Sequence, residues 1–472
     1  MNNNSPEDYT LTDIPKLSSL KKDKSPKIAI NKKVIIITFG FFQNESIWSV
    51  RLCGLAKYLP EFGWDPTIIT AQQTKSGQNR LVGQDSYNVV ETKYTDITAL
   101  ILSLLGINSG KSIKESLNLK SKKNKKTFCD FCFNLIKEVL YYPDAERGWY
   151  KYSLEAGIRL MEENKYEALI SSSSPVTGHL VAKNLKMRYN VPWIADLRDL
   201  WTQNHYYPYS VFRKIIETSL EKKTLGVADI LTTVSEPLSK QLSERYSGKQ
   251  ISVITNGFDP ENVNPGVSLS NKFTITYTGQ LYKGRRDPEL LFVALSELIH
   301  EGLLERESVS VDFYGNRESW LEDDIRKYNL SDVVSLHGVV SRETTIKKQW
   351  ESHILLLLTW DNPLEKGVYT GKVFDYLAAR RPILSLGLSG SVVTKLLKET
   401  NAGVHCSTVT EIKSYIIEKY TKFKTDGYTS YEGIQSKIDL YNHYEMAKKF
   451  AILLDNISSN HRTVDKNIGK SE

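Results

Sequence analysis

The segment from Gly367 to Pro382 places loop residues, a helix start and two charged side chains in an order that suits phosphate binding. Its glycines precede a predicted helix over Lys372–Arg380, and a proline ends that helix. The N-terminus of a helix offers free backbone N–H groups and about half a positive charge, which favour a bound phosphate. Because Lys372 adds a full positive charge in the first turn, we predict a phosphate site here.

Asp375 lies three residues after Lys372, on the same face of that helix. Its carboxylate can accept hydrogen bonds from sugar hydroxyls. An alternative is that the two side chains form only a solvated ion pair. The flanking apolar runs Ile354–Leu358 and Ile383–Leu386 make the unit strand, loop, helix, strand. In an open parallel sheet such loops lie at the carboxyl ends of the strands, where ligands bind, so the context favours a ligand site.

The composition indicates a globular chain with more than one domain. Its 472 residues are too many for one ordinary core, and 40% hydrophobic with 25% charged residues is typical of globular proteins. Four cysteines do not make a disulfide scaffold, and the pair Cys129 and Cys132 is expected to be buried on a helix rather than to bind metal. The sequence has no apolar run of about 18 residues and no signal-peptide pattern, so we expect a cytoplasmic protein.

Strand-like runs alternate with helical patterns along most of the chain, which predicts α/β domains with parallel sheets. The first unit comprises a strand at Val34–Thr38, a helix at Ser46–Leu59 and a strand at Thr67–Thr70. It lacks a Gly-x-Gly-x-x-Gly loop, so a plain dinucleotide-binding domain is disfavoured. Further strands are predicted at Ala168–Ser171, Trp193–Leu197, Ile230–Val234, Ser252–Ile254, Phe273–Thr278, Val309–Tyr314 and Val334–Leu336.

Asn256-Gly257 and the stretch Pro260–Pro265 mark a linker between two such series. A helix at about Tyr444–Ile457 has apolar residues on one face, so it must pack against another element. The predicted division is a disordered arm at 1–32, an N-terminal Rossmann-like domain at 33–260 with a lysine-rich insertion at about 108–127, a C-terminal Rossmann-like domain at 261–440, a helix at 441–458 that packs back on the N-terminal domain, and a flexible tail at 459–472.

The lysine-rich stretch Lys111–Lys126 contains seven lysines and one glutamate. A solvated surface loop is one interpretation. Peripheral contact with an anionic membrane is the other, since each lysine near such a surface contributes about 1 kcal/mol. Nucleic acid is disfavoured as a partner, because no recognised binding module accompanies the lysines.

Two nucleotide-fold domains with a linker near residue 260 describe the GT-B architecture. The chain resembles glycosyltransferase family 4 of bacterial cell-surface polysaccharide synthesis from about Val34 to Leu454, apart from the lysine-rich insertion. The resemblance is carried by the segment from Gly367 to Pro382 and by Leu55–Trp64, Pro192–Trp201, Ala228–Pro237, Val253–Asp259 and Tyr277–Pro288.

The resemblance implies a nucleotide-diphosphate sugar held mainly by the C-terminal domain and an acceptor held mainly by the N-terminal domain. It implies that the ribose binds to Asp375 and that the base binds to the backbone between Gly338 and Val340. Basic groups, with Arg286 alongside, would stabilise the charge that builds on the leaving diphosphate. The residues implied for the diphosphate are Gly279, Lys283, Arg285, Thr370, Gly371 and Lys372.

Two positions depart from the family pattern. A glutamate that the family places eight residues before Asp375 is replaced by Gly367, with Glu365 close by. A histidine that the family places after the strand Trp193–Leu197 is replaced by Arg198, which cannot act as a base but can bind phosphate or orient Asp199. The candidate catalytic residues are therefore Arg198, Asp199 and His179.

These features predict a retaining glycosyltransferase that moves a sugar from a nucleotide-diphosphate donor to a cell-surface polysaccharide or lipid-linked acceptor. Retention is implied by the family, with departure and attack on one face of the sugar. No Asp-x-Asp motif is present, so no obligatory metal or other cofactor is expected. A non-catalytic GT-B nucleotide-binding or scaffold protein and a nucleotide-sugar 2-epimerase remain as alternatives. The expected location is the cytoplasm, with peripheral contact at the inner face of the plasma membrane.

Overall fold

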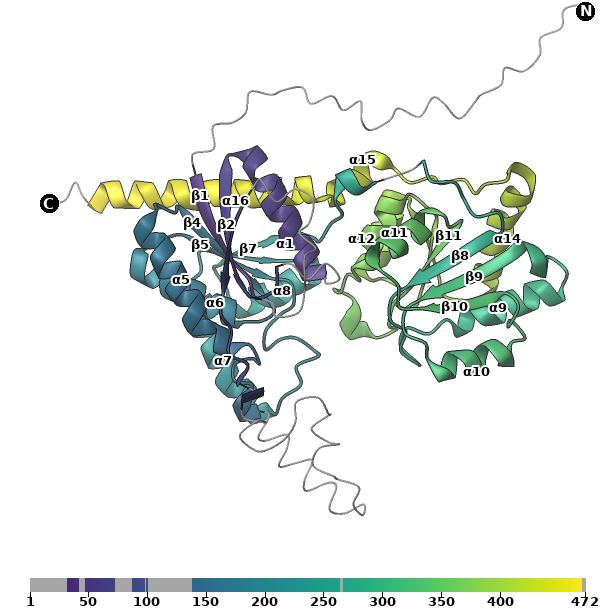
Figure 1. Ribbon diagram of the computed structural model, residues 1–472, viewed down its shortest axis with the longest axis horizontal. Helices are drawn as coiled ribbons and strands as arrows, with labels where there is room; N and C mark the ends of the chain where they lie inside the picture. The colour runs from purple at the N-terminus through teal and green to yellow at the C-terminus, as the bar shows by residue number, and fades with distance from the viewer. Residues whose placement is uncertain are drawn as a thin grey trace, which may run out of the picture.

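The computed structural model describes residues 32–41, 47–72, 87–97, 99–100, 138–263 and 266–468. The predicted arm up to residue 31, the stretch Lys111–Lys126, Cys129 and Cys132 lie outside the described residues. The described chain forms two α/β domains, each built on one parallel sheet (Figure 1). This arrangement confirms the predicted GT-B fold class.

The N-terminal domain has a seven-stranded sheet in the order β3-β2-β1-β4-β5-β6-β7. Central strands such as β4 are buried on both faces because helices cover the sheet on both sides, which explains their continuous apolar or small residues. Its strands are β1 (Lys32–Ile37), β2 (Trp64–Ala71), β3 (Asn88–Thr92), β4 (Ala168–Ser173), β5 (Trp193–Leu197), β6 (Ile230–Thr233) and β7 (Gln250–Val253). Its helices include α1 (Ile47–Tyr58), α5 (Tyr150–Glu163), α6 (Thr177–Tyr189), α7 (Val211–Leu225) and α8 (Glu236–Arg245).

The C-terminal domain has a six-stranded sheet in the order β10-β9-β8-β11-β12-β13. Its strands are β8 (Phe273–Thr278), β9 (Val309–Tyr314), β10 (Val334–Gly338), β11 (Ile354–Leu358), β12 (Ile383–Leu386) and β13 (Gly403–Cys406). Its helices are α9 (Glu289–His300), α10 (Ser319–Lys327), α11 (Arg342–Trp350), α12 (Lys372–Ala379), α13 (Val392–Thr400), α14 (Val409–Asp426) and α15 (Gln435–Ile438). The predicted unit of strand, loop, helix and strand is therefore β11, α12 and β12.

The last helix, α16 (His443–Ile468), returns to the N-terminal domain and runs along it (Figure 1). Phe450 and Leu454 join the same buried core as Val34 of β1. At the edge of that contact, Asp455 accepts a hydrogen bond from Trp64 Nε1 at 3.0 Å. The apolar stripe predicted from the sequence is thus buried against the first domain.

The end of α16 differs from the sequence prediction. We predicted a flexible tail from residue 459, but the helix continues through 459–468. The physical reason is that no glycine or proline occurs between Ser458 and Gly469, so nothing in the sequence stops the helix before that glycine. None of the described helices combines the length and apolar character needed to cross a membrane.

Two chain crossings lie side by side between the domains. The Phe258 N–H donates to the Tyr441 carbonyl at 3.1 Å, and the His443 N–H donates to the Phe258 carbonyl at 2.8 Å. A Cβ at Gly257 would lie 2.6 Å from the Tyr441 carbonyl oxygen, so this close approach requires glycine. The Asn256-Gly257 signal in the sequence therefore marks the hinge between the two domains.

Candidate functional site

The end of β8 meets the start of α12 at Gly279. This glycine has φ of +111°, and a Cβ there would lie 2.4 Å from Cε of Lys372. The Gly279 N–H donates to the carbonyl of Tyr314, at the end of the neighbouring strand, at 2.6 Å. The structure thus brings together Gly279 and Lys372, which the sequence placed in the same site from segments about 90 residues apart.

The Lys372 ammonium is a partly buried cation without a counter-ion among the described residues. It donates to the phenolic oxygen of Tyr277 at 2.6 Å and lies 4.0 Å from the centre of that ring. No carboxylate pairs with it among the described residues. Burial, and then the charge of Arg286, hold the pKa of Lys372 well below its usual value. A bound anion at this position would offset both effects.

The start of α12 offers further hydrogen-bond donors. Gly371 is the N-cap residue and no side chain caps the helix. The Val373 and Phe374 N–H groups donate to the carbonyls of Thr370 and Gly371, so the N–H groups of Gly371 and Lys372 are the ones left for a ligand. The Thr370 hydroxyl is buried and has no hydrogen-bond partner, which is uncommon for a buried polar group. The three residues predicted at this helix start therefore gather donors and a positive charge in one place.

Arg285 and Arg286 follow β8 and point to different neighbours. Arg285 is exposed, and its guanidinium carbon lies 4.3 Å from the centre of the Trp360 ring. Arg286 lines a narrow pocket together with Thr370 and Trp360. It is Arg286 whose charge acts on Lys372. The resemblance to family 4 implied Arg285 for the diphosphate, with Arg286 alongside, whereas in the structure Arg286 is the one that lines a pocket with Thr370.

Lys283 lines a wider cavity of about 440 Å³ at the carboxyl ends of β8 and β9. Its ammonium lies 5.9 Å from the centre of the Trp320 ring. The other lining residues are Gln280, Leu281, Tyr282, Arg285, Asn316, Glu318 and Trp320. This mixture of aromatic rings, cations and polar groups is typical of a site for a polar, charged ligand.

Asp375 makes a contact that the sequence did not predict. Its carboxylate receives two hydrogen bonds from Arg342 of α11, at 2.9 and 3.4 Å. Arg342 comes 33 residues earlier in the chain, and no local pattern linked it to Asp375. Gly338 is the last residue of β10, the strand that precedes α11 in the chain, and has φ of +76°. Val340, just beyond it, is partly buried. The predicted ribose and base residues thus lie at the same edge of the sheet.

A buried charge network supports the N-terminal side. Asp196 at the end of β5 pairs with Arg51 of α1 at 3.0 Å and accepts a hydrogen bond from Ser172 at 2.8 Å. Arg198 donates to the same Ser172 hydroxyl at 3.1 Å, and burial lowers the pKa of Arg198 to about 10. Arg198 is therefore held at the end of β5 as a largely buried cation.

The other two candidate catalytic residues lie in different surroundings. His179 is fully buried, with Nδ1 2.7 Å from the Ser171 hydroxyl, and burial lowers its pKa to about 4. Its ring packs beside Trp193 in the core. Asp199 is exposed. This placement favours a structural role for His179 and leaves Asp199 accessible to a substrate. Both catalytic assignments stay predictions.

Glu365 of the C-terminal domain contacts the N-terminal domain, where the loop after β5 carries His205 and Tyr206. The His205 Nε2 lies 2.5 Å from the Glu365 carboxylate, and the Tyr206 hydroxyl donates to the same carboxylate. The Tyr206 ring stacks on Trp360, with ring centres 6.3 Å apart. Nearby, the Ser235 hydroxyl donates to the Gly367 carbonyl at 2.7 Å. We call these contacts the interdomain contact.

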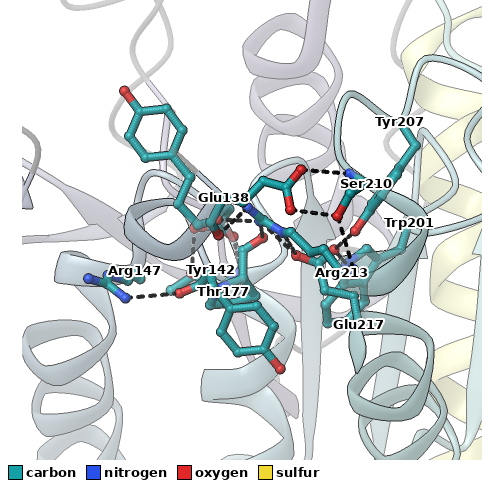
Figure 2. Close-up of polar contacts among 12 residues, drawn as sticks. Glu138, Tyr142, Arg147, Thr177, Trp201, Tyr207, Ser210, Arg213 and Glu217 are labelled. Atoms are coloured by element: carbon teal, nitrogen blue, oxygen red, sulfur yellow. Dashed lines mark hydrogen bonds and ion pairs between the residues drawn. The ribbon is translucent and has the colours of Figure 1, made fainter. Parts of the chain in front are cut away.

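The loop after β5 is held at Trp201 and Tyr207 by Glu217 of α7, which is paired with Arg213 (Figure 2). Arg213 donates to Glu217 at 2.7 Å, and Glu217 also accepts hydrogen bonds from Tyr207 at 2.7 Å and Trp201 at 3.3 Å. The Glu138 carboxylate accepts hydrogen bonds from the N–H and hydroxyl of Ser210, the residue before α7. The remaining partners of Arg213 are the carbonyls of Glu138, Tyr141 and Pro143.

Across the described ranges, no group of three or more His, Cys, Asp or Glu side chains is arranged to hold a metal ion. The polar groups at the facing ends of the two sheets include cations, hydroxyls and backbone N–H groups. The carboxylates of Asp375 and Glu365 there are hydrogen-bonded to Arg342 and His205, and that of Asp199 is exposed. Such a set can bind an anionic ligand and stabilise a leaving anion.

Comparison with known proteins gives one match in sequence families. Residues 128–262 match the sequence model of Glycosyltransferase Family 4. No curated protein matches the chain in sequence.

Several solved structures share the whole fold at low sequence identity. A sucrose-phosphate synthase from Thermosynechococcus elongatus aligns with a TM-score of 0.59 and 12% identity, over 91% of this chain and 100% of its own. Anabaena HepE in complex with UDP and glucose aligns with a TM-score of 0.57 and 12% identity, over 90% of this chain and 100% of its own. A glycosyltransferase from Rickettsia africae aligns with a TM-score of 0.56 and 14% identity, over 90% of this chain and 98% of its own.

Proposed function

We propose that the chain, which has the GT-B fold and matches Glycosyltransferase Family 4 over residues 128–262, is a glycosyltransferase. It moves a sugar from a nucleotide-diphosphate donor to a cell-surface polysaccharide or lipid-linked acceptor. We further propose that the anomeric configuration is retained and that no metal ion or other cofactor is required. The similar structure of HepE was determined with UDP and glucose, which supports a nucleotide sugar as the donor.

The observation that carries this proposal is the partly buried ammonium of Lys372 at the uncapped start of α12, which has no carboxylate partner among the described residues. Burying a cation without a partner costs free energy, so the arrangement is sensible only if a ligand supplies the missing negative charge. A diphosphate would accept hydrogen bonds from Lys372, from the Thr370 hydroxyl and from the first N–H groups of the helix. Arg285 and Arg286 would add positive charge from the opposite side.

These donors would act most strongly as the bond to the leaving diphosphate breaks. Negative charge then accumulates on the leaving oxygen, and donors that are already in place need no reorganisation to stabilise it. The acceptor would approach from the N-terminal domain, where Asp199 is exposed at the end of β5. Glu365 lies two residues from Gly367, the position that departs from the family pattern, and we propose that its carboxylate contacts the transferred sugar.

The test is thermal-shift screening of the purified chain against nucleoside diphosphates and their sugars, followed by a transfer assay with the donor that binds. We expect Arg286→Ala, at the arginine that lines the pocket with Thr370, to reduce affinity for the donor about 10- to 100-fold, which corresponds to the loss of one charge-assisted hydrogen bond. Lys398→Ala, an exposed lysine on α13, is the matched control and should bind donor like the wild type.

Four outcomes test the proposal against its alternatives. Binding of the donor without transfer to any glycan would support a non-catalytic nucleotide-binding protein. Formation of an epimer from the donor alone would support a 2-epimerase. Transfer that disappears in EDTA and returns with a divalent ion would contradict the proposal that no metal is required. The absence of any shift with every nucleotide would overturn the transferase proposal.

The predicted cytoplasmic location and the membrane contact through Lys111–Lys126 remain proposals, because those lysines lie outside the described residues. Sedimentation with anionic liposomes, before and after the lysines are changed to glutamine, tests the contact. Unchanged sedimentation would exclude this stretch as the cause.

A further inference from the structure

The outward face of α7 is apolar, whereas a surface helix normally turns polar residues toward water. Its four exposed hydrophobic side chains share one side of the first two turns of the helix. They are Val211, 76% exposed, Phe212, 74%, Ile215, 66%, and Ile216, 43%. We call these four residues, together with Lys214 among them, the α7 outer face.

The inward face of the same helix is charged. Arg213, Glu217 and Glu221 are all buried there. Arg213 pairs with Glu217 at 2.7 Å, and Glu221 pairs with Arg245 of α8 at 2.8 Å (Figure 2 shows the first pair). The buried residues of the first turns are therefore polar and engaged, while Leu225 at the end of the helix packs in the domain core. The four exposed apolar residues lie on the other side of the first two turns. They are available to a partner outside the domain.

The charges on the exposed side of α7 have one sign. Lys214, Lys222 and Lys223 are exposed, while both glutamates of the helix are buried. The outer side therefore combines hydrophobic residues with cations and has no exposed carboxylate. This combination is complementary to an anionic bilayer, in which apolar side chains enter the acyl region and lysines reach the headgroups.

We propose that the α7 outer face docks on an anionic lipid bilayer, with Phe212 and Ile215 inserted and Lys214, Lys222 and Lys223 at the headgroups. Figure 1 shows α7 at the end of the N-terminal domain away from α16. The loop that leads into α7 carries His205 and Tyr206 of the interdomain contact, so docking would hold the mouth of the site near the lipid surface. Only this last consequence, delivery of a lipid-linked acceptor, rests on the proposed function.

The test uses the full chain and vesicles without any donor or acceptor, so its failure is distinct from failure of the glycosyl transfer. Binding is measured by flotation with phosphatidylcholine vesicles and with vesicles that also contain phosphatidylglycerol. We expect binding to the anionic vesicles that weakens as salt is added. The Phe212→Ser, Ile215→Ser double variant should bind about ten-fold or more weakly, because the apolar contact is lost.

The matched control is Leu303→Ser, Ile452→Ser, which removes two exposed hydrophobic side chains elsewhere, 49% and 53% exposed, and should bind like the wild type. Changing Lys214, Lys222 and Lys223 to glutamine should remove the preference for anionic vesicles. Equal binding by wild type and the Phe212, Ile215 variant would overturn the proposal. The proposal would also be overturned if the wild type formed a concentration-dependent dimer that this variant abolished, since the face would then bind a second copy of the chain. A Tm lowered by several degrees without lipid would overturn it too, since the face would then pack against the chain itself.

Discussion

Lys372 is the residue at which the stability of the fold and the binding of a ligand make opposite demands. Its pKa is held well below its usual value by burial and then by Arg286, so the charged form is disfavoured in the folded chain. A cation whose folded pKa is lowered costs stability at every pH below its unfolded pKa, which includes neutral pH. A cation that destabilises the fold in this way is expected at a binding site, because a bound anion offsets its cost.

The Lys372→Met variant should separate the two demands. We expect the free energy of unfolding of the ligand-free protein to be unchanged or higher at pH 7, because the unpaired cation is gone. We expect affinity for a nucleoside diphosphate to fall about 10- to 100-fold. Urea denaturation and calorimetric titration measure the two quantities. A less stable variant with unchanged affinity would mean that Lys372 is a structural residue.

Glu146 is a second perturbed residue, and it lies far from the phosphate site in sequence. Burial, and then the charge of Asp144, raise the pKa of Glu146 from 4.5 to about 7. Asp144 itself accepts a hydrogen bond from the Thr177 N–H at 2.7 Å, at the start of α6. Because the neutral form of Glu146 is favoured in the folded chain, the contribution of this residue to the free energy of unfolding is complete below pH 4.5. That contribution is lost as the pH rises through about 7.

Glu146→Gln should therefore raise Tm at pH 8 and leave it nearly unchanged at pH 4. Differential scanning calorimetry at both values makes the comparison. Glu163→Gln, at an exposed glutamate at the end of α5, serves as the control and should change Tm at neither pH. An equal shift of Tm at both pH values for Glu146→Gln would contradict the assigned ionisation.

At the scale of elements, Arg213 connects α7 to the segment 138–143, whose carbonyls accept its hydrogen bonds, and to Tyr209 in the loop that follows β5. Its guanidinium lies 3.3 Å from the centre of the Tyr209 ring and serves three backbone carbonyls as well as Glu217. The loop that reaches the C-terminal domain is thus held by the buried Arg213–Glu217 pair, through Trp201 and Tyr207 at Glu217 and through Tyr209 at Arg213.

We expect Arg213→Leu to lower the free energy of unfolding by about 3–5 kcal/mol, because it leaves Glu217 buried without its partner. The double variant Arg213→Leu, Glu217→Leu should recover part of that loss. Lys214→Gln, at the exposed neighbouring position, should change stability by less than about 0.5 kcal/mol. Urea denaturation decides, and an Arg213→Leu loss no larger than that of Lys214→Gln would show that the network adds nothing.

At the scale of the whole molecule, the two domains are joined by the hinge at Gly257 and meet again at the interdomain contact. Glu365 of the C-terminal domain is held by His205 and Tyr206 of the N-terminal domain. The same carboxylate lines a pocket with Arg286 and Thr370, so closure of the domains and the geometry of the phosphate site are linked through it.

The His205→Ala, Tyr206→Ala variant should open the molecule. Small-angle X-ray scattering of the ligand-free protein should give a larger radius of gyration than the wild type, and kcat should fall more than the donor affinity. Tyr428→Ala, which removes an exposed ring from the C-terminal domain, is the control for the loss of a tyrosine. Unchanged scattering would mean that other contacts set the closure.

The sequence by itself predicted most of the strands and their order, but not the strands β3 and β13. Strands β5, β8, β9, β11 and β12 begin and end where the apolar runs predicted, since strands buried on both faces read as continuous apolar or small residues. Gly371 and Lys372 could be named because a helix start needs particular residue types nearby in the chain, whereas Gly279 was implied by the resemblance to family 4. The alternation of strands and helices then indicated two domains of one class.

Only the tertiary structure decided which distant side chains meet. No local sequence pattern predicts that Arg342 pairs with Asp375 or that His179 is buried. The same is true of Arg286, rather than Arg285, lying beside Lys372, and of the contacts of His205 and Tyr206 with Glu365. The outward apolar face of α7 also depends on which side of the helix Arg213 and Glu217 turn toward the domain. Side-chain contacts across 30 to 160 residues follow from how the sheets and domains pack, and periodicity along one element does not encode that.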